Sequence, residues 1–322
     1  MLVCLRMLFA AVGHAHCSTG MHVRTLLLVL VATTTVFAGT PPVVGGSTVP
    51  SGKWPDAVAV LGAKGMCTGT LIAPTVVVTA GHCAGIEANQ VIANTTDYAS
   101  GGGARANIKS VTAYPDWKNT FDVSVIVLET PIAGIEPRAV GTACTFSTFT
   151  TASHVHLVGF GRTTETGSGG NTQLHEAMAS VRDPDCSKGL GCEPAIAPGG
   201  EFVAGGDGTD SCFGDSGGPV YLDTASGQVL IGAVSRGVDG SSSVCGGGGI
   251  YVRTDKIVDW LEATAKTTIT KNACAAQPSS DGSESGSSSA GAGTDAGGCA
   301  ASSPSFALAP FAALLLLRRR RR

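Results

Sequence analysis

Three separated segments of the 322-residue chain carry side chains that together could perform nucleophilic chemistry. Ser216 lies in the glycine-rich stretch GDSGG, His82 lies in TAGHC, and Asp122 directly precedes the apolar run VSVIVL. A serine hydroxyl is a weak nucleophile at neutral pH, so it needs a neighbouring base and preorganised donors for the oxyanion that it creates. Histidine can serve as that base, and a carboxylate can orient the histidine. The three segments therefore predict acyl transfer at Ser216.

The glycines around Ser216 predict the donors for such an oxyanion. Gly214 and the two glycines that follow Ser216 allow the backbone to turn tightly. In such a turn the amides of Gly214 and Ser216 could both point at one oxygen atom. We expect these two amides to form an oxyanion hole.

The base and its carboxylate each have a competing interpretation. A lone histidine is more often structural than catalytic, but His82 follows the β-type run 75–78 and directly precedes Cys83. Asp116, in the stretch YPDW, is the alternative to Asp122. We predict that Asp122 orients the histidine, because it directly precedes a run typical of a buried strand, and that Asp116 is a turn residue.

In the order His82, Asp122, Ser216, these segments resemble the chymotrypsin-like (trypsin-type) serine protease family over residues 43–267. The resemblance implies an all-β fold of two antiparallel Greek-key barrels with a C-terminal helix. The 45 glycines and the short valine-rich runs independently favour an all-β chain with many turns. The apolar spacing at 254–265 predicts the closing helix.

The resemblance also implies the residues of a specificity pocket. Asp210 stands six residues before Ser216, where the trypsin branch of the family has the floor of its primary pocket. A buried carboxylate there would select substrates with Arg or Lys at the cleaved bond. Ser235, Gly237 and Gly249 match the substrate-binding segments of the family. Arg236 departs from the pattern, since the family usually has Trp there, and we expect it to place a cation near the substrate's second residue.

An activation step is implied by the stretch VVGG that begins at Val43. In the family, cleavage before this residue frees an amino group that pairs with the aspartate preceding the catalytic serine, here Asp215. Burying a lone carboxylate is costly, so the new ammonium group could hold the oxyanion loop in its active form. Pro42 departs from the family, which usually offers Arg or Lys at this bond. The activating enzyme is therefore not identified by the sequence.

Eight cysteines lie from Cys67 to Cys274, an even number that suits disulfides in an oxidising compartment. The resemblance implies bridges between Cys67 and Cys83 and between Cys212 and Cys245. For the remaining four, Cys186 with Cys192 and Cys144 with Cys274 is one pairing that the sequence leaves open. A metal cluster is the alternative, but neither the cysteine spacings nor the pair His154 and His156 match a known metal site.

Both ends of the chain predict segments outside the folded body. Residues 1–38 are typical of a leader with a secretory signal, with Met21 as the alternative start, and 39–42 would be a short propeptide. Residues 268–298 have the composition of a disordered linker. In residues 299–322, Cys299, a short apolar run and five arginines resemble a myxobacterial C-terminal sorting signal that attaches the protein to the cell surface. A retained membrane tail is the alternative.

These observations predict a secreted or cell-surface bacterial serine endopeptidase that cleaves after Arg or Lys and needs no cofactor and no metal. A calcium ion bound by a loop is an open alternative. Protein substrates are the expected partners and proteinaceous inhibitors are candidates. Without the five terminal arginines the net charge of −3 becomes −3 − 5 = −8, which argues against nucleic-acid binding. The competing hypothesis is a protease-fold binding module that is never activated.

Overall fold

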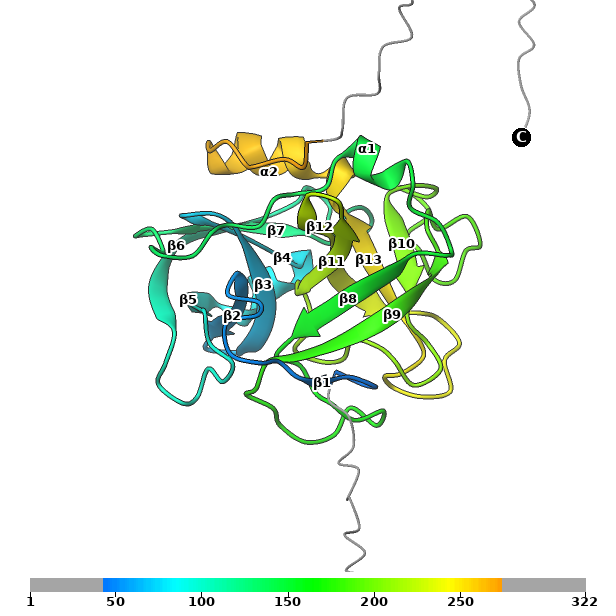
Figure 1. Cartoon of the computed structure of the whole chain (residues 1–322), viewed down its shortest axis with the longest axis horizontal. Coiled ribbons are helices and arrows are strands. Elements are labelled where there is room, and N and C mark those ends of the chain that lie inside the picture. The colour runs from blue at the N-terminus through cyan, green and yellow to red at the C-terminus, as the bar shows by residue number, and fades with distance from the viewer. Residues whose placement is uncertain (1–42, 274–322) are drawn as a thin grey trace, which may run out of the picture. The chain divides into compact units, whose positions relative to one another are not determined.

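The computed structural model describes residues 43–273 and consists mainly of β-strands. Six antiparallel strands form a first closed barrel on the N-terminal side (Figure 1). In spatial order they are β2 (Ala57–Gly62), β3 (Gly65–Ala73), β4 (Val76–Thr79), β7 (Ser124–Leu128), β6 (Ala104–Ala113) and β5 (Ala88–Ala93).

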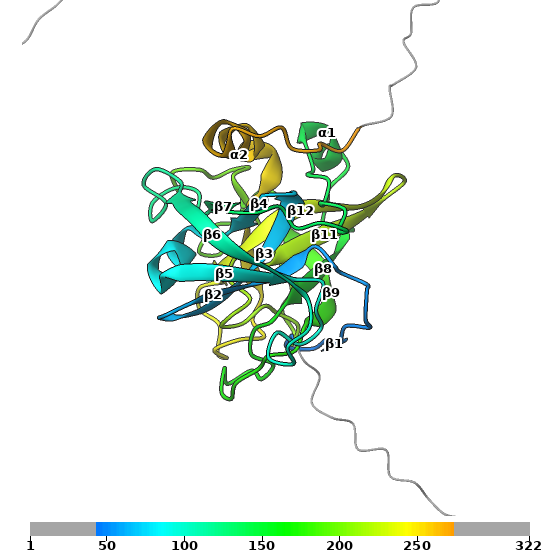
Figure 2. The same ribbon diagram turned by 90° about the vertical axis from the view of Figure 1, so that its left-hand side faces the viewer.

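A second barrel repeats this order with the next six strands. They are β8 (His154–Gly159), β9 (His175–Asp183), β10 (Glu201–Ala204), β13 (Gly249–Arg253), β12 (Gly227–Gly237) and β11 (Pro219–Thr224). The pairing of β8 with both β9 and β11 closes the ring, and the short β1 (Ser47–Thr48) pairs with β9. The expected fold class of two antiparallel barrels is confirmed. Figure 2 shows both barrels from the side.

The strand sequences explain why these segments form barrels. β4 is the run VVVT, and all four of its residues are buried. Strand β9 alternates buried and more exposed positions along its length, so every second side chain faces the barrel interior. β-branched residues favour both arrangements, because they pack well on a pleated surface.

Helical segments are short. They are η1 (Gly81–Ile86), α1 (Ala143–Phe146), η2 (Thr254–Lys256) and α2 (Val258–Ala265). The expected helix over 254–265 is present, but its first turn is the 3-10 helix η2, and the α-helix begins only at Val258. Leu261 is buried against the core, whereas Trp260 is only partly buried there.

The sequence predicts the start of the linker at residue 268, which is earlier than the structure shows. Ile269 is 2% exposed and belongs to the core. Val140 N–H donates to Thr270 O and Asn272 N–H donates to Val140 O, each at 2.8 Å. Residues 268–273 therefore continue the folded body, because one buried apolar side chain and these backbone hydrogen bonds hold them. The predicted leader and sorting signal lie outside the described residues. Within 43–273, no helix has the length and apolarity needed to cross a membrane.

A buried polar network joins the two barrels. Asp56, directly before β2, is fully buried and pairs with Arg138, which lies on the connection between the barrels. Tyr221 of β11 in the second barrel donates its hydroxyl to Asp56 Oδ2 at 2.7 Å, and its ring stacks on Trp54 at 4.6 Å. Burial, the adjacent carboxylate and the hydrogen bond that it donates raise the pKa of Tyr221 well above its usual value. The network therefore fixes one barrel against the other.

Replacing Arg138 with Met should destabilise the protein strongly. The substitution leaves the Asp56 carboxylate buried without a cation, which costs about 3–5 kcal/mol of unfolding free energy. Urea denaturation monitored by fluorescence measures this change. Lys64→Met is the matched control, because Lys64 pairs with Glu87 at the surface with both side chains exposed, and its loss should cost at most about 1 kcal/mol. Equal losses in the two variants would contradict the role of the buried network.

Candidate active site

His82 and Asp122 are brought together by two neighbouring strands of the first barrel. His82 lies in η1, which begins two residues after β4 ends, and Asp122 lies two residues before β7 begins. Strands β4 and β7 pair with Thr79 opposite Ser124, so both residues leave the barrel at the same edge. His82 Nδ1 lies 2.9 Å from Asp122 Oδ2, and the His82 backbone N–H donates to Asp122 Oδ1 at 2.9 Å. These contacts fix the ring and leave Nε2 available for a proton transfer.

The Asp122 carboxylate is held in its ionised form by hydrogen bonds. It is 8% exposed, and burial by itself would disfavour its charge. That effect is outweighed by hydrogen bonds from His82 and Ser235, so the pKa of Asp122 lies below its ordinary value. Ser235 Oγ, on β12 of the second barrel, donates to Asp122 Oδ2 at 2.7 Å. One carboxylate therefore joins residues of both barrels.

The loop that carries Ser216 packs against the first barrel. Thr68 of β3 donates its N–H to Ser216 O at 3.0 Å and its hydroxyl to Gly214 O at 2.8 Å. Gly217 has φ +76°, and a Cβ atom there would lie 2.1 Å from Thr79 Oγ1 and 2.3 Å from Ala80 N. Only glycine permits this approach, which brings the serine loop against the segment that leads into His82.

Within residues 43–273, the amides of Gly214 and Ser216 donate to no acceptor. Gly214 has φ +99°, a conformation that glycine adopts readily. Two neighbouring amides without internal partners are the donors that an oxyanion hole requires. The role expected for them stays a prediction, because no bound oxyanion tests it.

One cavity of about 380 Å³ is lined by the expected base and nucleophile, His82 and Ser216, and by most of the residues expected to bind substrate. Its lining includes His82, Ser216, Asp210, Ser235, Arg236, Gly237, Phe213 and Val244. A Cβ atom on Gly237 would have only Gly248 O nearby, at 3.9 Å, so the space beside it is open. Phe213 and Val244 are 59% and 62% exposed and form an apolar rim.

Gly249 is the one expected substrate-binding residue that does not line this cavity. It is buried and pairs with Gly237 across β12 and β13. A Cβ atom there would lie 2.5 Å from Tyr251 Oη and 3.0 Å from Ser211 Oγ. The absence of a side chain at Gly249 therefore makes room for the Tyr251 ring of the same strand and for the loop that carries Ser211.

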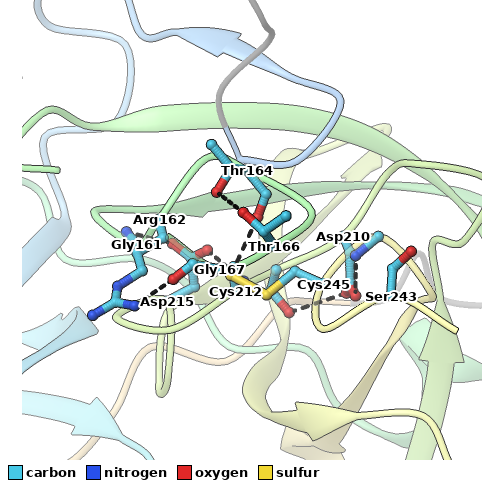
Figure 3. The surroundings of a disulfide bond; sticks show 12 residues. Gly161, Arg162, Thr164, Thr166, Gly167, Asp210, Cys212, Asp215, Ser243 and Cys245 are labelled. Atoms are coloured by element: carbon cyan, nitrogen blue, oxygen red, sulfur yellow. Dashed lines mark hydrogen bonds between the residues drawn. A yellow bond between two sulfur atoms is a disulfide. The ribbon is translucent and has the colours of Figure 1, made fainter. Parts of the chain in front are cut away.

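Asp210 is buried at the cavity without a cation among the described residues. It is 2% exposed, and its Oδ2 accepts the N–H groups of Gly246 and Gly248 at 3.0 and 3.1 Å. Burial raises the pKa of Asp210 to about 6 despite these hydrogen bonds. Figure 3 shows Asp210 near the disulfide between Cys212 and Cys245. Such a carboxylate favours a ligand that brings its own positive charge.

Asp215 is a second buried carboxylate, next to Ser216 in the sequence. It is 1% exposed and accepts the N–H groups of Gly161 and Cys212, both at 2.8 Å (Figure 3). Burial raises its pKa to about 7, and within 43–273 no cation lies within ion-pair distance of it. Val43 is 1% exposed and packs in the core of the second barrel.

The structure contains three disulfides with both cysteines in the described residues. They join Cys67 to Cys83, Cys186 to Cys192, and Cys212 to Cys245. The pairing suggested for Cys144 involves Cys274, which lies outside the described range. Each group of three potential metal ligands that the described residues bring together includes one of these disulfides. A disulfide sulfur is no thiolate ligand, so neither group forms a metal site of the expected kind.

Sequence reasoning missed the partner of Arg236. The Arg236 guanidinium makes two hydrogen bonds with the Glu201 carboxylate, at 2.7 and 3.0 Å, and Glu201 is 1% exposed. Arg236 does line the cavity, so its expected place near a substrate stays a prediction, but a buried carboxylate already pairs with its charge. The signal was available: Glu201 begins an otherwise apolar strand, and a buried charge requires a partner.

Comparison with known proteins identifies the family. The model of the trypsin family matches residues 43–261, which is more than half of the chain. Relatives include serine protease 56 of Mus musculus, 31% identical over 68% of this chain, and the trypsin of Saccharopolyspora erythraea, 32% identical over 68% of this chain and 96% of its own length. The glucanase inhibitor protein 3 of Phytophthora infestans is 29% identical over 75% of this chain and 95% of its own length. The aligned part covers 38% of mouse serine protease 56.

Two closed β-barrels, with His82, Asp122 and Ser216 where their loops meet, define a protein with the architecture of a serine protease. The chain belongs to the trypsin family.

The stability of the uncleaved chain should fall as pH rises from about 4 to about 7 because of Asp215. Its pKa is raised from 3.8 to about 7 by folding, so in this window the folded state holds a proton that the unfolded state has released. The free energy of unfolding therefore falls as pH rises, by a few kcal/mol at most. Urea denaturation at several pH values, in the Ser216→Ala background to prevent self-cleavage, measures this slope.

In this experiment Asp215→Asn should make the slope shallower, since it removes one of two buried carboxyl groups that titrate in this window. Asp210, whose pKa burial raises to about 6, accounts for the slope that remains. The control is Asp207→Asn, an exposed aspartate, which should leave the slope unchanged. A slope as steep in Asp215→Asn as in the Ser216→Ala background alone would contradict the assignment.

Proposed function

We propose that this protein is a secreted serine endopeptidase that hydrolyses peptide bonds after Arg or Lys. The observation that carries the proposal is one cavity that holds a carboxylate-bound histidine, Ser216 and the buried Asp210. A binding surface alone would need no such combination of base, nucleophile and buried charge. Membership of the trypsin family and relatives named as serine proteases support a peptidase.

In the proposed mechanism, Ser216 Oγ attacks the scissile carbonyl carbon while His82 Nε2 takes its proton. The carbonyl oxygen becomes an oxyanion, and the amides of Gly214 and Ser216 donate to it. The intermediate collapses as His82 passes the proton to the leaving amine, which leaves an acyl group on Ser216. Water then repeats the sequence and releases the acid. Asp122 holds the imidazole in the tautomer with its proton on Nδ1, so that Nε2 can act as a base.

The proposed preference for Arg and Lys rests on the desolvated Asp210. A cationic side chain would satisfy this carboxylate, whereas an apolar side chain would leave it buried and unpaired. The open space beside Gly237 can admit a long side chain. Protein and peptide substrates are thus the proposed partners, with proteinaceous inhibitors as further candidates for the same cavity.

Activation and export are part of the same proposal. Cleavage after Pro42 would free the amino group of Val43, and this ammonium would supply the cation that Asp215 lacks. The three disulfides suit an extracellular location. We further propose that residues 1–38 direct secretion and that residues 299–322 attach the protein to the surface through Cys299.

Two observations favour a second candidate function. A relative matched over 95% of its own length carries the name of an inhibitor, so a chain of this family can be named for binding to another enzyme. Pro42 at the activation bond points the same way. Under this hypothesis the chain stays uncleaved and the cavity binds without turnover.

Peptide substrates that differ only at the cleaved residue should separate Arg and Lys from Phe. We expect kcat/KM to favour Arg and Lys by a factor on the order of 10⁴, because Phe leaves Asp210 unpaired. Ser216→Ala should abolish turnover, and Asp210→Ser should remove the preference for Arg and Lys while keeping measurable cleavage of Phe. Equal cleavage after Phe by the unaltered protein would refute the specificity.

The ratio of these kcat/KM values should also fall as pH drops below about 6, where Asp210 takes up a proton. His82 affects both substrates alike, so the ratio isolates Asp210. A ratio that does not change between pH 7 and pH 5 would count against the role of Asp210.

Protein recovered from the producing cells should start at Val43 and should be labelled at Ser216 by an organophosphonate. Amino-terminal sequencing and mass spectrometry of the labelled peptide measure the two properties on one sample. The Ser216→Ala variant controls for labelling elsewhere. A mature protein that retains Pro42 and takes no label would favour the binding module instead.

A further inference from the structure

The hydrogen bonds that begin at the His82–Asp122 pair continue into the second barrel. Ser235 Oγ lies 2.7 Å from Asp122 Oδ2 and 3.0 Å from Arg236 Nη1. The Arg236 guanidinium in turn makes its two bonds with Glu201, at 2.7 and 3.0 Å. Four hydrogen-bonded contacts thus connect the imidazole to a carboxylate on β10.

The chemistry of the two neighbours of Ser235 fixes the direction of its proton. A guanidinium can only donate, and an ionised carboxylate can only accept. The Ser235 hydroxyl must therefore accept from Arg236 and donate to Asp122. Without Arg236 the hydroxyl could rotate toward another acceptor, and Asp122 would lose a donor for part of the time.

The position of the guanidinium is itself determined by four hydrogen bonds, two with the Glu201 carboxylate and two with Gly191. Gly191 O accepts from Arg236 Nη2 at 3.0 Å and from Arg236 Nε at 3.3 Å. Gly191 lies in the loop closed by the disulfide between Cys186 and Cys192. Glu201 also accepts the backbone N–H of Glu193 at 2.8 Å, so its carboxylate is held from two sides.

We propose that Arg236 and Glu201 are positioning residues for the catalytic pair: Glu201 holds the guanidinium against Ser235, and this fixes the Ser235 hydroxyl as a donor to Asp122. The inference deepens the proposed peptidase function and rests on it. A donor fixed on Asp122 disperses its negative charge, so the carboxylate attracts a proton on the imidazole less strongly.

The test variant replaces both Arg236 and Glu201 with Met and is called the Met–Met variant below. It removes the donor to Ser235, keeps the net charge, and leaves no unpaired buried charge, which a single substitution would do. With the single-residue ester benzoyl-arginine ethyl ester, kcat should fall about tenfold with little change in KM. The acidic limb of the pH–rate profile should move up by about half a pH unit.

A second measurement does not need turnover. NMR titration of the His82 ring, in the Ser216→Ala background, should give a midpoint that moves up by the same amount in the Met–Met variant. The other ionisable groups near the ring are Asp122, Asp210 at the same cavity, and Lys118, whose ammonium lies 5.6 Å from the Trp117 ring centroid. Asp215, next to Ser216, completes this set. Every variant retains them all.

The path through Ser235 is tested by a double-mutant cycle. In a Ser235→Ala background, the Met–Met change should have no further effect on kcat or on the His82 midpoint. Arg236→Lys, with Glu201 retained, should keep part of the kcat that the Met–Met variant loses, because lysine also donates and keeps the charge. The control replaces Arg253 and Asp255 with Met, since the carboxylate of this pair is buried as Glu201 is and neither residue contacts the triad. It should leave kcat and the midpoint unchanged.

The outcomes separate this inference from the proposed function. If the unaltered protein hydrolyses the ester and the Met–Met variant matches it in kcat and in the His82 midpoint, the positioning role is wrong. An effect that persists in full in the Ser235→Ala background would also overturn it. If only KM for longer peptides changes, Arg236 is a subsite residue and the inference fails. If the unaltered protein hydrolyses nothing but the midpoint moves as expected, the peptidase proposal fails while the positioning role stands.

Discussion

The site depends on one buried carboxylate whose acceptor positions must all be filled. Asp122 takes hydrogen bonds from the backbone and the ring of His82 and from Ser235. These donors come from both barrels, so the carboxylate can be satisfied only when the barrels are docked correctly. The Asp56 network also depends on correct docking of the barrels, because it too joins the first barrel to β11 of the second. Barrel docking and preparation of the base are therefore a single structural event.

The buried carboxylates around the site fall into two kinds. Asp56 and Glu201 are paired with the guanidinium groups of Arg138 and Arg236, which compensates their charge internally. Asp210 and Asp215 have only backbone amides and hydroxyls among the described residues, and burial raises the pKa of both. A protein gains no stability from an uncompensated buried charge. Such a carboxylate is explained when its cation is supplied later. A substrate side chain would supply the cation for Asp210, and a new amino terminus would supply it for Asp215.

The sequence predicted the elements that local motifs define, and it failed where the explanation lies in distant contacts. The two-barrel fold followed from the family motifs and from valine-rich strands such as β4. The link between Arg236 and Glu201 did not, because the residues are 35 positions apart and no spacing rule joins them. The same reason explains Ile269: its neighbours have the composition of a linker, and only its burial in the core shows that the chain is still folded there. The roles of His82, Asp122 and Ser216 were predicted from motifs and await chemical tests.

Membership of the family leaves the activity open, because a relative named as an inhibitor shares the fold. The energetics of the site favour catalysis. A binding surface has no use for the fixed proton arrangement that connects Glu201, Ser235 and His82, and replacing buried ionic groups with apolar ones of similar size is often neutral or stabilising. A chain selected only for binding could therefore simplify this network at no cost. Its complete set of partners, from the imidazole to β10, fits the proposed role of His82 as a base that accepts and returns a proton.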